Sequence, residues 1–149
     1  MTWPADDSLN WNTSMKAHML VGHNADGTHD SSELNTYKIH QWTRAQTSGT
    51  GTDEIRGIGF EPRMVMFYAV RAGLPSLSTG TDNAVTARCT YQDYNDDMGT
   101  DSGNSIYLLA ASGSSWVAEI DSMESDGFDV GWTISGTPGT AWVMAICFK

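Results

Sequence analysis

The chain has 149 residues, of which 40% are hydrophobic and 17% charged, and its formal net charge at pH 7 is −10. This composition is typical of one folded domain and excludes a disordered chain, which would carry more charge and fewer aromatic residues. The acidic balance excludes the basic surface that nucleic acids and anionic membranes require. Every apolar run is too short to cross a membrane as a helix, so no membrane insertion is expected.

Residues 1–36 differ in pattern from the rest and are predicted to form an N-terminal arm for attachment and oligomerisation. Asp7 or Ser8 is a suitable capping residue for a short helix over about residues 9–20. Apolar and aromatic residues recur along this segment at the spacing of one helix face. Large aromatics on an arm often anchor protein interfaces. The predicted attachment residues are Trp3, Trp11, Met15, His18 and Met19.

A polar loop is expected after this helix, and it carries His23, Asp26 and His29 at intervals of three residues. Histidine and aspartate both suit divalent metal ions. No companion ligands accompany them in the sequence, so a solvated loop or hydrogen bonding between chains is favoured over a metal site. The three residues remain candidates for inter-chain contacts or for a weak metal site.

From residue 37 to residue 149 the pattern predicts an all-β domain, an antiparallel β-sandwich or jelly roll of about eight strands. The Asp126-Gly127 pair predicts a hairpin turn between the strands expected at 116–120 and 128–135. Loops are expected at 45–53, 74–83 and 92–104. Strands are expected at 37–43, 55–60, 64–70, 85–91, 105–111, 116–120, 128–135 and 141–148.

Residues 64–70 and 141–148 are apolar at both alternating sets of positions, which predicts middle strands buried on both faces. Four tryptophans lie in predicted strands and are predicted to belong to the core: Trp42, Trp116, Trp132 and Trp142. Replacement of Trp142 by Ala is therefore expected to destabilise the fold by about 3–5 kcal/mol. The two cysteines, Cys89 and Cys147, are expected to be buried free thiols.

The most acidic stretch lies in the loop expected at 92–104, and a second loop is expected at 73–83; both are candidate contact surfaces. The surface-loop contact candidates are Asp93, Asn95, Asp97 and Asp101. The first three match the first ligand positions of a calcium loop, but the glycine and the bidentate glutamate of such a loop are missing. A solvated loop is favoured, with a single weak Ca²⁺ as the alternative, and no other cofactor is expected.

No signature of catalysis is found in the sequence. A nucleophile elbow, a phosphate loop and a dinucleotide fingerprint are all missing. The carboxylate pairs Glu119 with Asp121 and Glu124 with Asp126 fall at a strand end and a turn, where solvated charge is the ordinary explanation. No enzymatic activity is expected.

Three segments carry a resemblance to a known family. Residues 57–65 read GIGFEPRMV, and residues 126–130 (DGFDV) are followed by GTPGT at 136–140 and an apolar last strand. Together these segments resemble small β-sandwich domains of tailed-bacteriophage structural proteins. The segment HNADGTH at 23–29, which follows Trp11-Asn12, resembles the N-terminal regions of phage tail-fibre-like proteins.

The resemblance implies a virion component without catalytic residues. Because the N-terminal residues are acidic, no signal peptide is expected and synthesis in the host cytoplasm follows. The expected function is that of a trimeric tail appendage or tail-fibre component, bound to other tail proteins and attaching to a glycan or receptor on the host surface. The alternative is a trimeric capsid decoration (cement) protein, bound to the major capsid protein. An alternative of another class is a carbohydrate-binding β-sandwich module.

Overall fold

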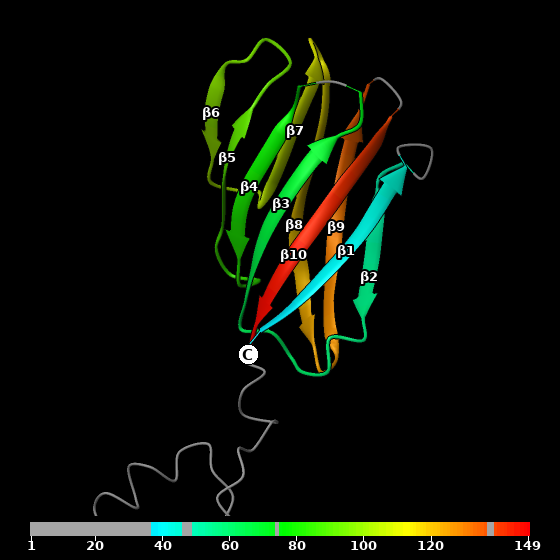
Figure 1. The fold of residues 1–149 in the computed structure, drawn as a ribbon, viewed down its shortest axis with the longest axis vertical. Coiled ribbons are helices and arrows are strands. Elements are labelled where there is room, and N and C mark those ends of the chain that lie inside the picture. Colours follow the sequence, from blue (N-terminus) through cyan, green and yellow to red (C-terminus); the bar gives the residue numbers. More distant parts are fainter. Residues whose placement is uncertain (1–36, 46–48, 74, 137–138) are drawn as a thin grey trace, which may run out of the picture. The chain divides into compact units, whose positions relative to one another are not determined.

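The computed structural model describes residues 37–149, apart from 46–48, 74 and 137–138. The predicted N-terminal arm, its helix and its polar loop lie outside the described residues, and so do the attachment residues from Trp3 to Met19 and the set His23, Asp26 and His29. The described part is all-β and consists of two antiparallel sheets, as the sequence predicted (Figure 1).

The described residues form ten strands rather than the eight that were predicted. The two additional strands lie in segments that were expected to be loops, at 77–82 and 98–101. The strands are β1 (Tyr37–Ala45), β2 (Gly51–Arg56), β3 (Met64–Arg71), β4 (Leu77–Asp82), β5 (Ala87–Gln92), β6 (Met98–Asp101), β7 (Ile106–Ala111), β8 (Ser114–Glu124), β9 (Gly127–Ser135) and β10 (Thr140–Phe148).

The larger sheet has the strand order β1-β10-β3-β4-β5-β6, and the smaller sheet has the order β2-β9-β8-β7 (Figure 1). Strands β3 to β6 follow one another as a meander, and so do strands β7 to β9. The chain changes sheet before β2, β3, β7 and β10. Strand β10 therefore lies between β1 and β3, which confirms its predicted position inside a sheet.

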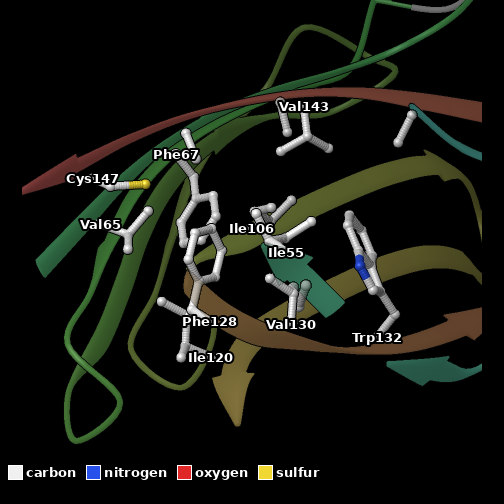
Figure 2. Packing of buried hydrophobic residues seen from close by; sticks show 14 of the residues in the cluster. Ile55, Val65, Phe67, Ile106, Ile120, Phe128, Val130, Trp132, Val143 and Cys147 are labelled. Carbon is white, nitrogen blue, oxygen red and sulfur yellow. The ribbon is translucent and has the colours of Figure 1, made fainter. Parts of the chain in front are cut away.

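One hydrophobic core lies between the two sheets, as Figure 2 shows in part. The smaller sheet contributes large side chains, among them Trp116, Phe128 and Trp132. The rings of Phe67 and Phe128 meet edge to face, with their centroids 5.9 Å apart. The inward positions of β10 are small, and they are Ala141, Val143, Ala145 and Cys147. Large residues of one sheet are thus accommodated by small residues of the other, as close packing requires.

Residues 77–82 were predicted to be part of a loop, and this prediction is wrong, because they form strand β4. The strand was missed because its inward residues are polar. Ser78 Oγ accepts a hydrogen bond from the backbone N–H of Tyr107 on β7, at 3.0 Å. The carboxylate of Asp82 accepts one from the backbone N–H of Ile120 on β8, at 2.8 Å. Both polar side chains are buried and connect the two sheets. Burial of a polar group is tolerated when it is hydrogen-bonded, so no apolar alternation marks this strand.

The hairpin turn predicted at Asp126-Gly127 is confirmed, because Glu124 of β8 pairs with Gly127 of β9 across it. The carboxylate of Asp126 accepts hydrogen bonds from the backbone N–H of Gly57 at 3.0 Å and of Gly59 at 2.6 Å. Both glycines have φ in the left-handed region, +80° and +88°, which favours glycine at these positions. The GIGF segment therefore folds around the β8–β9 turn.

The stability that Asp126 contributes at this turn is expected to depend on pH. Hydrogen bonds from Gly59 and Gly57 lower the pKa of Asp126 below its ordinary value of 3.8. Its contribution to stability is therefore present above the unfolded pKa and lost as the pH falls through the folded pKa. We expect Asp126→Ala to be less stable than the wild type at pH 7, and this difference to shrink below about pH 4. Urea denaturation of both proteins across pH 2–7 measures the difference in their free energies of unfolding. A difference that does not change with pH would contradict a stabilising role of the ionised Asp126 carboxylate.

Both cysteines are buried and free, as predicted. Burial raises the pKa of the Cys147 thiol to about 11. Cys147 lies on β10 and Cys89 on β5, and strands β3 and β4 lie between them. Three strand spacings amount to about 14 Å, which is too far for a disulfide. The two thiols therefore lie apart in the same sheet and do not form a disulfide with each other.

Candidate binding face

The surface-loop contact candidates lie at two ends of the β5–β6 hairpin. The Asp93 carboxylate accepts hydrogen bonds from the backbone N–H groups of Asn95 at 2.7 Å and Asp97 at 3.0 Å, and so closes the turn. Asp101 pairs with Cys89, three residues further along the hairpin than the Gln92–Met98 pair. At the rise of a strand this separates Asp101 from the turn by about 10 Å. The four residues therefore do not converge on one point.

The Asp101 carboxylate is also occupied by the local backbone. It accepts hydrogen bonds from the backbone N–H of Gly103 at 2.9 Å and of Asn104 at 2.7 Å. Burial acts to raise the pKa of Asp101, but these hydrogen bonds outweigh it and the pKa is lowered. Within the described residues no group of three or more His, Cys, Asp or Glu is placed to hold a metal ion.

Trp142 was predicted to belong to the core, and this prediction is wrong. Its side chain is 56% exposed, whereas Trp116 and Trp132 are buried and Trp42 packs against the core. The large residues of β10 point away from the smaller sheet, and its small residues point toward it. Strand β3 shows the same division, with Met64, Met66 and Tyr68 on the exposed side. Neighbouring strands hydrogen-bond to both edges of a middle strand, but they do not bury both of its faces.

The outward side chains of β1, β10 and β3 form one apolar surface, which we call the outer apolar face. The strand register places them in cross-strand rows, because Ile39 lies opposite Ile146, and Ile146 lies opposite Met66. The most exposed members are Trp142, Tyr37 (54%) and Ile39 (50%). The outer apolar face consists of Tyr37, Ile39, Met64, Met66, Tyr68, Val70, Trp142, Met144, Ile146 and Phe148.

A groove of about 630 Å³ opens on this face between β1, β10 and β3. The rings of Trp142 and Tyr68 line it, together with Val70 and Met144. Gln41 and Thr43 of β1 add an amide and a hydroxyl to the lining. The groove thus combines aromatic surface with neutral hydrogen-bonding groups.

The outer apolar face and the outer surface of the smaller sheet differ in charge. In the described part of the chain, the side chains of β1, β3, β4 and β10 that lie on the side of the outer apolar face are uncharged. The exposed Lys38 of β1 alternates to the other side, and the nearest charge on the same side of the sheet is the exposed Arg88 of β5. The smaller sheet instead turns acidic residues outward, and Arg56 forms an ion pair with one of them, Asp129, at 2.6 Å. The outward acidic residues of the smaller sheet are Glu54, Glu119, Asp121 and Asp129. One surface is therefore suited to solvent and the other to contact.

Sequence reasoning missed this face because an apolar strand position was equated with a buried one. The signal was present in the alternation of large and small residues along 141–148. A strand that packs against Trp116 and Trp132 needs small inward residues, so its large residues must lie on the opposite side.

Searches of protein-family models, curated proteins and solved structures found no match to this chain. Among the described residues, no helix has the length and apolar character needed to cross a membrane.

Proposed function

We propose that this protein is a non-enzymatic β-sandwich that works by binding and assembly, as a structural component of a tailed-phage virion. The observation that carries the binding role is the outer apolar face, which is uncharged although the chain has a net charge of −10. Exposed apolar patches of this kind mark interaction sites. The classification as a sandwich is supported by the single core that both sheets share. The virion assignment is supported by the resemblance of the GIGFEPRMV, DGFDV and HNADGTH segments.

Within the virion, we propose a trimeric tail appendage that takes part in attachment to the host surface. A capsid decoration protein is the alternative, and the two differ in copy number. Densitometry of purified particles against the major capsid protein measures this number. A small multiple of three or six per particle supports the tail, and hundreds of copies would indicate capsid decoration. Absence from the particles would overturn the virion assignment.

The exposure of Trp142 favours a second candidate, a carbohydrate-binding module. The C–H face of a sugar ring stacks on aromatic side chains, and Trp142 and Tyr68 both line the groove. Gln41 and Thr43 could then hydrogen-bond the sugar hydroxyls.

The test of this candidate is binding of neutral oligosaccharides by titration calorimetry. If the groove binds sugar, Trp142→Ala should weaken binding by about tenfold or more, which corresponds to about 1.4 kcal/mol. The matched control, Trp142→Phe, retains an aromatic ring and should keep most of the affinity. Equal affinities for wild type and Trp142→Ala would exclude the groove as the sugar site.

A further inference from the structure

The composition of the outer apolar face is that of a protein interface. Three of its members are methionines and four are aromatic: Met64, Met66, Met144, Tyr37, Tyr68, Trp142 and Phe148. The centres of protein interfaces are enriched in Met and aromatic residues and depleted of charge. A sugar site requires only the part around Trp142 and leaves the aliphatic rows from Ile39 to Met66 unexplained.

The face also reaches the edge of the sheet. Among the described strands, β1 pairs only with β10, so its other edge is not paired within this part of the chain. Tyr37 and Ile39 lie on this edge strand, and both are at least half exposed. Exposed apolar edge strands favour association between chains, and proteins usually cover or charge them. Here the start of the edge strand carries two exposed apolar side chains, Tyr37 and Ile39, with the exposed Lys38 between them on the other side of the sheet.

The distribution of charge favours contact between two copies through the outer apolar face. Each chain has a net charge of −10, so two copies repel one another at most orientations. Contact through the smaller sheet would bring Glu54, Glu119 and Asp121 of one copy close to the same residues of the other. The outward positions of β1, β10, β3 and β4 add no charge to the contact. Of the two sheet surfaces, it is therefore the one on which two acidic copies meet with less repulsion.

The size of the face is adequate for such a contact. Together with the uncharged outward side of the neighbouring strand β4, the face spans four strands at a spacing of about 4.8 Å, with a mean length of about 26 Å, and this surface has a footprint of about 500 Å². Two such faces bury about 1,000 Å² in total, which is the lower limit for a specific protein interface.

From these observations we propose that a second copy of this chain covers the outer apolar face. The inference rests on the proposed function only in taking this face as a contact surface. Contact between the same face of two copies is isologous, so the two copies are related by a two-fold axis. The aromatic groove around Trp142 is then part of the subunit interface.

The test is the mass of the full chain in solution, measured by light scattering after gel filtration. One chain has a mass of 16.2 kDa, and the wild type is expected at twice this value. Ile39→Glu and Trp142→Glu are each expected to reduce the mass to that of one chain, because each buries a carboxylate in the contact. Both positions are at least 50% exposed in the single chain, so the fold tolerates the charge.

Thr133→Glu is the matched control, because it adds the same charge at an exposed position of the smaller sheet. It should leave the mass unchanged. A monomeric wild type would overturn the proposal, and so would a multimer that persists in both face variants. Neither result bears on the virion assignment, which the copy number in particles tests separately.

A second measurement uses the wild type alone and does not depend on the folding of a variant. Peroxide oxidises methionines according to their exposure. Met98 on β6 is 71% exposed, and Met64 and Met66 are 38% and 36% exposed, so the single chain would show about a twofold difference in rate. Burial by a second copy should increase this difference to about tenfold. A difference that stays near twofold at high protein concentration would overturn the proposal.

Discussion

Replacement of Trp132 by Ala is expected to lower the free energy of unfolding by about 3–5 kcal/mol, the usual effect of truncating a large buried aromatic side chain. Trp132 is 2% exposed and lies between the two sheets (Figure 2). The guanidinium of Arg44 lies 5.5 Å from its ring centroid, in a cation–π contact. Arg44 is itself buried and paired with Asp53, so the cavity would also disturb an ion pair.

Trp142→Ala is the matched control for this prediction, because it removes the same side chain from the exposed side of the other sheet. In the single chain, Trp142→Ala should lower the free energy of unfolding by about 1 kcal/mol or less. Both changes are best measured by urea denaturation in the Ile39→Glu background, where the proposed assembly is removed. Equal losses at the two positions would contradict the division of the sheet into a buried and an exposed side.

Gly80→Ala is expected to destabilise the fold by about 3 kcal/mol, at the upper end of the usual effect of overpacking. A Cβ atom at Gly80 would overlap the backbone carbonyl oxygen of Ser105. It would also lie 2.7 Å from the carbonyl oxygen of Arg88 on the neighbouring strand. Both obstacles are backbone atoms, so neither can move aside as a side chain would. The methyl group would push β4 away from the start of β7.

Gly103→Ala provides the control for Gly80→Ala. The atom nearest to a Cβ at Gly103 is a carboxylate oxygen of Asp101, at an ordinary 3.8 Å. Its stability should change by less than about 0.5 kcal/mol. Chemical denaturation of both variants measures the difference. A wild-type midpoint for Gly80→Ala would contradict the close approach of Gly80 to the carbonyl oxygen of Ser105.

Several elements could be predicted from local sequence because their chemistry is local. The Asp126-Gly127 pair predicted its turn, since few dipeptides adopt that backbone geometry. Strand β9 was recognised from the alternation of Phe128, Val130 and Trp132 with polar or small residues, and these three side chains are buried. In such strands, one face is apolar and the other polar, so the period of two is visible in the sequence.

Strands β4 and β6 could not be found in this way. The inward residues of β4 are Ser78, Gly80 and Asp82, and their partners Tyr107 and Ile120 are distant in the sequence. A buried serine or carboxylate is favourable only when such a partner is present. Strand β6 has only four residues, Met98–Asp101, and is stabilised by pairing with β5. Both strands depend on tertiary contacts.

The outer apolar face also depends on tertiary contacts that local sequence does not reveal. The sequence by itself determined that the described part of the chain is all-β and that 64–70 and 141–148 lie in strands, because alternation and turn chemistry act between near neighbours. It did not determine which side of β10 is buried, since both sides are apolar. The tertiary structure decided this through volume: Trp116, Trp132 and Phe128 fill the space between the sheets and leave room only for small residues on β10. Trp142 and its neighbours were thereby placed on the outer apolar face, where we propose that the chain meets its partner.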